Sequence, residues 1–177
     1  MLPTEFTKKT QDAFPGQPFW TKANIHLVRC TADHLELIHH MQKEAFAALL
    51  EKYRDHDTSP ANESPERITW KLRQPDSYFY RIEAGNQVVG AIRVVDAGDG
   101  SAKRISPLFI LPQHRGQGYA QAAILEAEKR HGSQNWELGT ILQEAGNCYL
   151  YEKMGYRQTG RRTVINEKMT IVGYEKD

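Results

Sequence analysis

The sequence has few cysteines, and neither sign of charge is in clear excess. Its only two cysteines, Cys30 and Cys148, are too few for a disulfide scaffold. The chain carries 23 lysines and arginines against 22 aspartates and glutamates, so its formal net charge is +1. This balance gives no electrostatic reason to expect nucleic acid or an anionic membrane as a partner. We expect a cytoplasmic protein that binds neither.

Long apolar runs are also missing. No stretch approaches the roughly 20 apolar residues of a membrane-spanning helix, and the first residues lack the basic and then apolar order of a signal peptide. The 177 residues suffice for one domain with a substantial core. We expect residues 1–22, where Pro15-Gly16 and Pro18 break any helix, to form an N-terminal extension, and residues 23–177 to form a single domain.

The histidines are not spaced as metal ligands. His34 and His39 are five residues apart, and neither His39-His40 nor His56 has a cysteine or histidine partner at a ligand spacing. We therefore predict no metal site. Cys148 is best interpreted as a small, buried thiol.

Hydrophobic periodicity and turn residues predict an α/β fold of the α+β kind. Apolar residues at helical spacing indicate a helix from a cap at Asp33 to about Tyr53. Ser64-Pro65 predicts the start of a second helix, and Gly85-Asn86 predicts a hairpin turn. Further helices are expected at residues 116–131 and 145–154, and strands at residues 25–30, 78–83, 88–95, 103–111, 136–142, 156–159 and 163–174.

The most informative segment is residues 113–120, which read Gln-His-Arg-Gly-Gln-Gly-Tyr-Ala. It follows an apolar run, residues 108–111, and leads into an amphipathic helix. A strand, a glycine-containing turn and a helix N-terminus together present several backbone N–H groups to a phosphate. Gly116 and Gly118 let the backbone approach an anion closely, and Arg115 adds a fixed positive charge. The segment therefore predicts a pyrophosphate cradle.

Two common nucleotide cradles do not fit this segment. A P-loop requires Gly-Lys-Ser/Thr at its end, but Tyr119, Ala120 and Gln121 follow the second glycine. A dinucleotide-binding fingerprint requires a third glycine, and Gln121 stands in its place.

The segment resembles the coenzyme A loop of the GNAT superfamily of N-acetyltransferases, and a second motif supports this. Residues 149–156, Tyr-Leu-Tyr-Glu-Lys-Met-Gly-Tyr, are similar to the superfamily's late Leu-Tyr-Glu-Lys-x-Gly-Phe signature. Both motifs occur in the expected order, and the resemblance covers roughly residues 25–174. It implies a mixed central β-sheet, flanked by helices and splayed between its fourth and fifth strands, where acetyl-CoA enters.

The resemblance also implies two sets of residues that bind the co-substrate. The fourth strand would offer the backbone N–H groups of Leu108, Phe109 and Ile110 to the thioester carbonyl and the pantetheine arm. The loop would hold the pyrophosphate, with Arg115 as its charged partner, through Gln113, His114, Arg115, Gly116, Gln117, Gly118, Tyr119 and Ala120.

Tyr151 matches the tyrosine that protonates the departing thiolate of coenzyme A in this superfamily. A phenol is protonated at pH 7 and can act as that acid. The alternative interpretation is a core tyrosine on an amphipathic helix. Tyr149 is a poor substitute, because two residues along a helix point to different faces.

The chain departs from the superfamily seven residues before Tyr151, where an asparagine commonly holds the pantetheine arm and Glu144 stands here. Asn147 lies one turn before Tyr151 and is expected to hold the arm instead. Glu144 is a candidate general base, or a first-turn carboxylate that the helix dipole favours. The other candidates for the base are Glu137, Asp57, Glu63 and a chain of water molecules.

The implied function is transfer of an acetyl group from acetyl-CoA to an amine, on a small molecule or an amino terminus, directly within a ternary complex. A set of acidic residues flanks the expected acceptor site and would attract a cationic amine, namely Glu44, Glu51, Asp55, Asp57, Glu63 and Glu66. The alternative is a non-catalytic acyl-CoA sensor or partner protein with the same fold. Many members of the superfamily pair through edge strands, so a homodimer is a further expectation.

Overall fold

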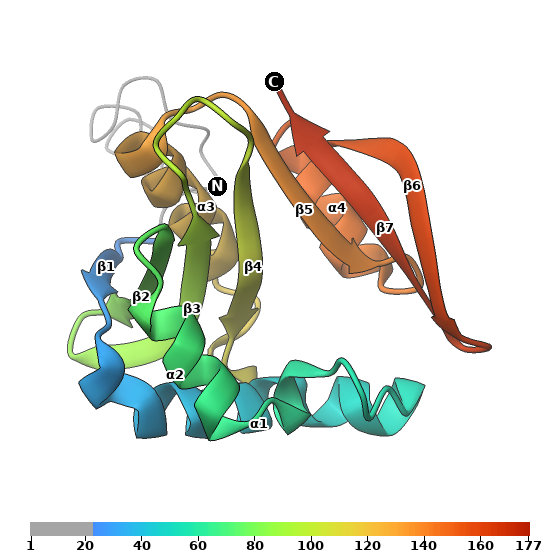
Figure 1. The fold of residues 1–177 in the computed structure, drawn as a ribbon, viewed down its shortest axis with the longest axis horizontal. Coiled ribbons are helices and arrows are strands. Elements are labelled where there is room, and N and C mark those ends of the chain that lie inside the picture. The colour runs from blue at the N-terminus through green and yellow to red at the C-terminus, as the bar shows by residue number, and fades with distance from the viewer. Residues whose placement is uncertain (1–22) are drawn as a thin grey trace, which may run out of the picture.

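The computed structural model describes residues 23–177, which build a seven-stranded mixed sheet with helices on both faces (Figure 1). The extension expected at residues 1–22 lies outside the described residues. The strands are β1 (His26–Arg29), β2 (Ser77–Ala84), β3 (Gln87–Val95), β4 (Lys103–Ile110), β5 (Trp136–Ile141), β6 (Arg157–Asn166) and β7 (Met169–Lys176). The α-helices are α1 (Leu35–Tyr53), α2 (Pro65–Arg73), α3 (Tyr119–His131) and α4 (Ala145–Lys153).

The sheet order is β1-β2-β3-β4-β5-β7-β6, and the single parallel pairing is that of β4 with β5. This pairing stops after two residue pairs, Lys103 with Trp136 and Arg104 with Glu137. The two strands then diverge and divide the sheet into β1–β4 and β5–β7 (Figure 1). The expected α/β class and the splay between the fourth and fifth strands are confirmed.

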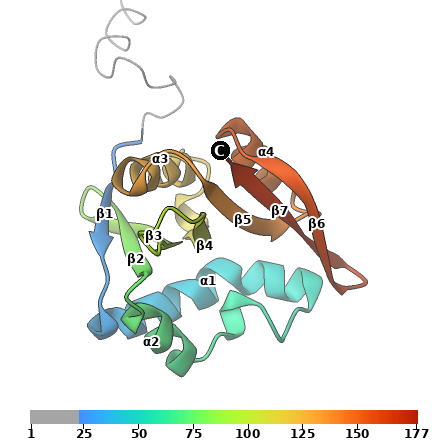
Figure 2. The same cartoon turned by 45° about the horizontal axis from the view of Figure 1, so that its top comes forward.

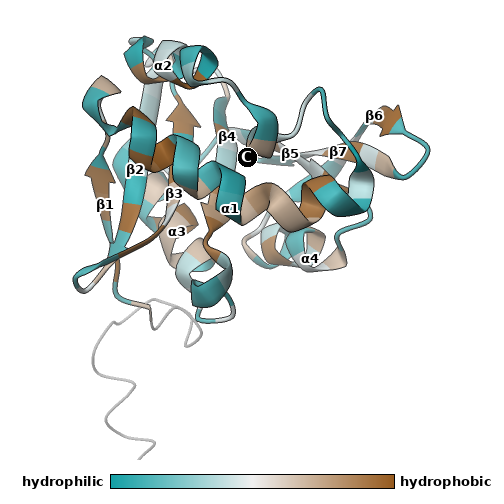
Figure 3. Ribbon diagram, turned by 90° about the horizontal axis from the view of Figure 1, so that it is seen from below, coloured by the Kyte–Doolittle hydropathy of each residue, from teal (hydrophilic) through white to brown (hydrophobic). Residues whose placement is uncertain are grey.

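Helices α1 and α2 cover one face of the sheet, and α3 and α4 cover the other (Figure 2). Two apolar clusters form the core. On the α1 side, Ile38 and Ile68 pack with Phe79, and on the α3 side Ile124 packs with Trp136. Helix α1 is amphipathic, and Figure 3 shows hydrophilic and hydrophobic residues alternating along it. It runs from the β1–β4 part of the molecule to the β5–β7 part.

A β-bulge shapes the edge of β4. Ser106 and Pro107 both stand opposite Arg93, where the register with β3 shifts. The buried Arg93 guanidinium donates from Nη1 to Ser106 O at 3.0 Å and from Nε to Ser77 Oγ at 2.8 Å. The side chain of Arg93 thus supplies the hydrogen bond that the bulged carbonyl lacks in the strand ladder.

Most helix boundaries follow from their capping residues. Ser64 Oγ accepts from Arg67 N at 3.1 Å at the start of α2, as expected. Helix α3 begins three residues later than predicted, because Gly116 (φ +75°) and Gly118 (φ +81°) adopt the left-handed conformation. Asp33 does not cap α1, since it lies inside a short 3₁₀ turn, Ala32–His34, that precedes the helix.

The predicted boundaries of the last two strands are wrong. We expected them at residues 156–159 and 163–174, but the chain turns between Asn166 and Met169 instead. Gly160 (φ +87°) forms an irregularity within β6 rather than its end. The actual turn has no glycine and is held by Asn166 Oδ1, which accepts from Lys168 N at 2.9 Å.

A buried ionic cluster joins the two parts of the sheet at the end where β4 and β5 pair. Glu128 of α3 accepts from Lys176 Nζ at 3.0 Å with each carboxylate oxygen and from Tyr156 OH at 3.1 Å. The Glu128 side chain is only 7% exposed. Burial and the neighbouring Glu128 carboxylate raise the pKa of Tyr156, so this phenol remains a donor.

We predict that Lys176→Met lowers the free energy of unfolding by about 3 kcal/mol, because Glu128 would remain buried without a cation. Urea denaturation measures this change. The matched control is Arg157→Met, which removes an exposed pairing with Asp177 at the same end of the molecule and should barely move the midpoint. Equal, small shifts in both variants would contradict the prediction.

Candidate active site

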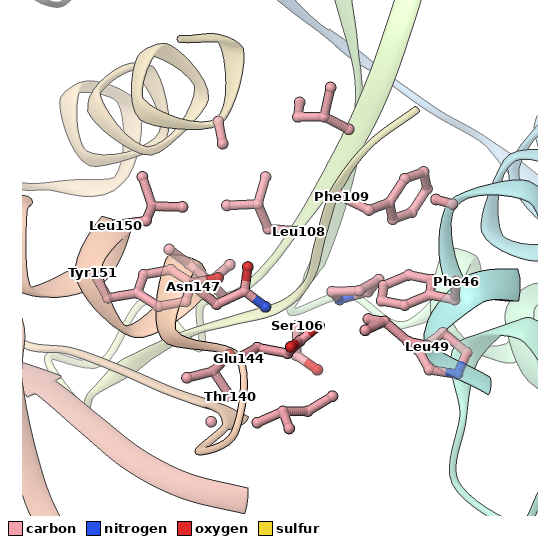
Figure 4. A pocket seen from close by; sticks show the side chains of 18 of the residues that line it. Phe46, Leu49, Ser106, Leu108, Phe109, Thr140, Glu144, Asn147, Leu150 and Tyr151 are labelled. Carbon is pink, nitrogen blue, oxygen red and sulfur yellow. The ribbon is translucent and has the colours of Figure 1, made fainter. Parts of the chain in front are cut away.

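A cavity of about 560 Å³ lies where β4 and β5 separate. Its walls come from α1, the β4 edge, the loop before α3, β5, α4 and β7. Figure 4 shows Asn147, Leu150 and Tyr151 reaching it from α4, opposite Phe46 and Leu49 of α1. Segments far apart in the sequence therefore meet around one space.

Backbone N–H groups of β4 point alternately toward β3 and toward this cavity. In the antiparallel ladder with β3, Leu111 N donates to Val89 O at 2.8 Å. Because the direction alternates, the N–H of Phe109 also faces β3, whereas those of Leu108 and Ile110 face the splayed edge. Of the three β4 residues expected to serve the co-substrate, Leu108 and Ile110 thus direct their N–H groups toward the cavity. Phe109 contributes its side chain to the wall.

The glycine-containing loop presents a row of free donors. Within residues 23–177, the N–H groups from Gly116 to Gln121 donate to no protein acceptor, and the first bond of α3 is from Ala122 N to Gly118 O. The left-handed conformation of the two glycines explains why the loop needs them. Of the predicted loop residues, those that line the cavity are His114, Arg115, Gly116, Gly118, Tyr119 and Ala120, whereas Gln113 and Gln117 do not.

Arg115 is anchored by the protein itself. Its Nη2 donates to Ala45 O of α1 at 2.7 Å, and its Nε donates to Ile110 O at the end of β4 at 3.1 Å. Arg115 lines the cavity and carries its charge beside the loop. It also ties the loop to α1, a contact that no local pattern predicts.

Tyr151 is buried, and it lines the cavity from α4. Burial raises the pKa of Tyr151 to about 12, so the phenol is neutral at physiological pH. Asn147 lies one turn earlier and lines the same cavity (Figure 4). Tyr149 is 66% exposed and points elsewhere, as expected from its helical position.

Glu144 points into the cavity from the start of α4 (Figure 4). Its Oε2 accepts from Lys52 Nζ at 3.0 Å and from Tyr53 OH at 3.1 Å. Asn166 Nδ2 donates to Tyr53 O at 2.9 Å. These bonds fix the end of α1 to the β5–β7 part of the molecule, so α1 closes one side of the cavity.

Sequence reasoning did not find several residues of this site. Lys52 and Tyr53 looked like an ordinary helix end, and Thr140 looked like an ordinary strand residue. Gln121 also lines the cavity, and its Oε1 is buried with no partner among the described residues. Its position in the first turn after the glycines was the one available signal.

Most of the six acidic residues that we expected to flank the acceptor site do not reach the cavity. Among the six residues, Asp55 alone lines it, and its carboxylate accepts from Thr58 N at 3.0 Å and from Thr58 Oγ1. Glu63 pairs with Lys71 at 2.6 Å. The other four are exposed and lie outside the lining, namely Glu44, Glu51, Asp57 and Glu66.

The remaining base candidate, Glu137, pairs with Arg161 at 3.6 Å and does not line the cavity. Among the described residues, Asp55 and Glu144 are thus the only carboxylate residues in the cavity wall.

Residues 23–177 contain no group of three histidine, cysteine, aspartate or glutamate side chains placed to hold a metal ion. Both cysteines are free thiols. In the same range, none of the helices is long and apolar enough to cross a membrane.

Comparisons with known proteins agree with this geometry. A family model described as the acetyltransferase (GNAT) family matches residues 36–156. No curated protein sequence matches the chain.

Several solved structures share the fold at low sequence identity. The PaiA N-acetyltransferase from Thermoplasma acidophilum, in complex with coenzyme A, has a TM-score of 0.65 and 16% identity over 87% of this chain and 99% of its own. Spermidine N-acetyltransferase from Vibrio cholerae, in complex with CoA and spermine, has a TM-score of 0.67 and 15% identity, over 85% and 93%. A ribosomal-protein alanine N-acetyltransferase from Escherichia coli has a TM-score of 0.63 and 14% identity, over 85% and 92%.

We predict that Tyr151 stays un-ionised at pH 10, where an ordinary tyrosine is half ionised. The measurement is a pH titration of tyrosinate absorbance in the wild type and in Tyr151→Phe. Up to pH 10 the two curves should coincide, because burial favours the neutral phenol. A difference between them with a half-point near pH 10 would contradict the burial of this side chain.

Proposed function

This chain belongs to the GNAT family of acetyltransferases, and we propose that it transfers the acetyl group directly from acetyl-CoA to an amine held in the same cavity. Acetyl-CoA is its co-substrate and an amine is its acceptor. One observation carries the proposed mechanism: the splayed edge of β4, the donors of the loop and the neutral phenol of Tyr151 all line one cavity.

The N–H groups of residues 116 and 118–121, which donate to no acceptor within residues 23–177, are proposed to bind the pyrophosphate of acetyl-CoA. They stand at the N-terminus of α3, where the helix dipole favours negative charge. Arg115 adds a full positive charge beside them. We assign the pantetheine arm to the N–H of Ile110, which faces the cavity from β4, and to Asn147.

Three groups are proposed to carry the chemistry. The amine nitrogen attacks the thioester carbon, and the N–H of Leu108 stabilises the negative charge that develops on the carbonyl oxygen. As the carbon–sulfur bond breaks, Tyr151 gives its phenolic proton to the thiolate. The nitrogen loses its proton as the new bond forms, and Glu144 receives it directly or through water.

Two further assignments complete the proposal. We place the protein in the cytoplasm, where its two free thiols would stay reduced. A homodimer that forms through an edge strand would use β1 or β6, the outer strands of the sheet. Strand β6 is the more exposed along its length.

We predict that Tyr151→Phe lowers kcat by about 100-fold, the lower end of the range for loss of a general acid, and leaves the dissociation constant of acetyl-CoA within about twofold. Initial rates of CoA release and calorimetric titration measure the two quantities. Tyr149→Phe, on the same helix but exposed, should change neither. Unchanged turnover in Tyr151→Phe would remove this residue from the mechanism.

We predict that Arg115→Glu weakens acetyl-CoA binding more than tenfold, or about 1.4 kcal/mol, because it reverses the charge beside the loop. Arg115→Met loses the same bonds to Ala45 and Ile110 without adding negative charge, so it separates structural from electrostatic effects. Arg130→Glu, at the other end of α3, is the matched control. Affinity within twofold of the wild type for Arg115→Glu would rule out this site for the pyrophosphate.

A further inference from the structure

We infer that the acceptor is a monoamine with an apolar body, and that it binds Glu144 as an ammonium, in the place that the Lys52 ammonium takes in this structure. The bound ammonium releases one proton to water before its nitrogen attacks, and Glu144 receives the second proton as the new bond forms. This inference rests on the proposed acetyl transfer and adds the class of the acceptor and the residue that selects it.

Part of the cavity wall opposite the loop at residues 113–120 is apolar. Phe46, Leu49 and Leu50 of α1 face the cavity, and Ile141, Met169 and Ile171 line it from the β5–β7 part of the molecule. The ring of Phe46 packs edge-on against Phe109, with centroids 5.6 Å apart, so its position is fixed. Such walls favour an aliphatic or aromatic body over one rich in hydroxyl groups or charges.

Countercharge in this cavity suffices for one ammonium. Among the described residues, the lining carries one arginine, Arg115, and two carboxylates, Asp55 and Glu144. Both oxygens of Asp55 already accept hydrogen bonds from Thr58 within its own turn. The positive charge of Arg115 offsets one of these two carboxylates, so a second ammonium of a polyamine would leave water for a site with no remaining net negative charge, which is unfavourable.

Glu144 already binds a primary ammonium in this structure. Lys52 Nζ lies 3.0 Å from its Oε2, and 58% of the Lys52 side chain is exposed. A pair with so exposed a partner contributes little stability, so an incoming amine can replace Lys52 at small cost. Tyr53 OH donates to the same oxygen at 3.1 Å and keeps the carboxylate in place during the exchange.

The test compares two acceptors of equal length at saturating acetyl-CoA. Hexylamine ends in a methyl group, whereas 1,5-diaminopentane carries a second ammonium in the place of that methyl group. We expect kcat/KM, from initial rates of CoA release, to be at least tenfold higher for hexylamine. A diamine or spermidine that equals or exceeds hexylamine would overturn the inference, and so would acetylation confined to a peptide with an N-terminal alanine.

Failure of the proposed function gives a different result. Suppose that acetyl-CoA raises the melting temperature but that hexylamine, the diamine, spermidine and the alanine peptide are all left unacetylated. The proposed transfer to an amine in this cavity is then itself contradicted. The inference about the acceptor class then falls with it.

Lys52 competes with the acceptor for Glu144, so a variant of Lys52 tests whether the acceptor replaces it there. Lys52→Met should lower the KM for hexylamine at least twofold and leave the KM for acetyl-CoA unchanged, because the carboxylate no longer holds its own ammonium. Lys43→Met removes an exposed lysine of the same helix that does not line the cavity, and it should change neither constant. A KM for hexylamine that stays the same or rises in Lys52→Met would overturn the exchange.

Discussion

The parallel pairing of β4 with β5, which ends after two residue pairs, is the constraint on which the site depends. A sheet normally satisfies its backbone groups by pairing each strand along its length, and unpaired buried groups are costly. Here β4 keeps its ladder with β3 but loses its other neighbour beyond Arg104, so the N–H groups of Leu108 and Ile110 have no strand to bind. The bulge at Ser106 and Pro107, held by Arg93, shapes the same edge. The donors of the site therefore result from the topology of the sheet.

Contacts bridge the gap between β4 and β5 at both of its ends. Where the strands still pair, Glu128 of α3 binds Lys176 of β7. Where they have separated, α1 spans the gap and is tied at its C-terminal end by the bond from Tyr53 to Glu144. Arg115 ties the middle of α1 to the β4 end and to the loop. Helix α1 is thus both a wall of the cavity and the brace that sets its width.

The two candidate catalytic side chains occupy contrasting surroundings in one cavity. Tyr151 is buried among apolar neighbours, and this burial keeps its phenol neutral and able to donate a proton. Glu144 accepts from the Lys52 ammonium and from the Tyr53 phenol with the same carboxylate oxygen. Proton donation and the binding of a cationic amine are therefore assigned to different sides of the same space.

The sequence by itself determined the order of helices and strands, the loop with its two left-handed glycines, and the placement of Asn147 and Tyr151 on one helix face. These features depend on periodicity, turn residues and spacing within a few residues, which a chain displays locally. The sequence did not predict the turn after Asn166, because this turn uses an asparagine in place of a glycine. Only the tertiary structure decided that the Arg115 guanidinium binds α1, that Glu144 pairs with Lys52, and that Asp55 alone of six acidic residues reaches the cavity. Those contacts join segments distant in the sequence, and the packing of α1 across the open sheet sets them.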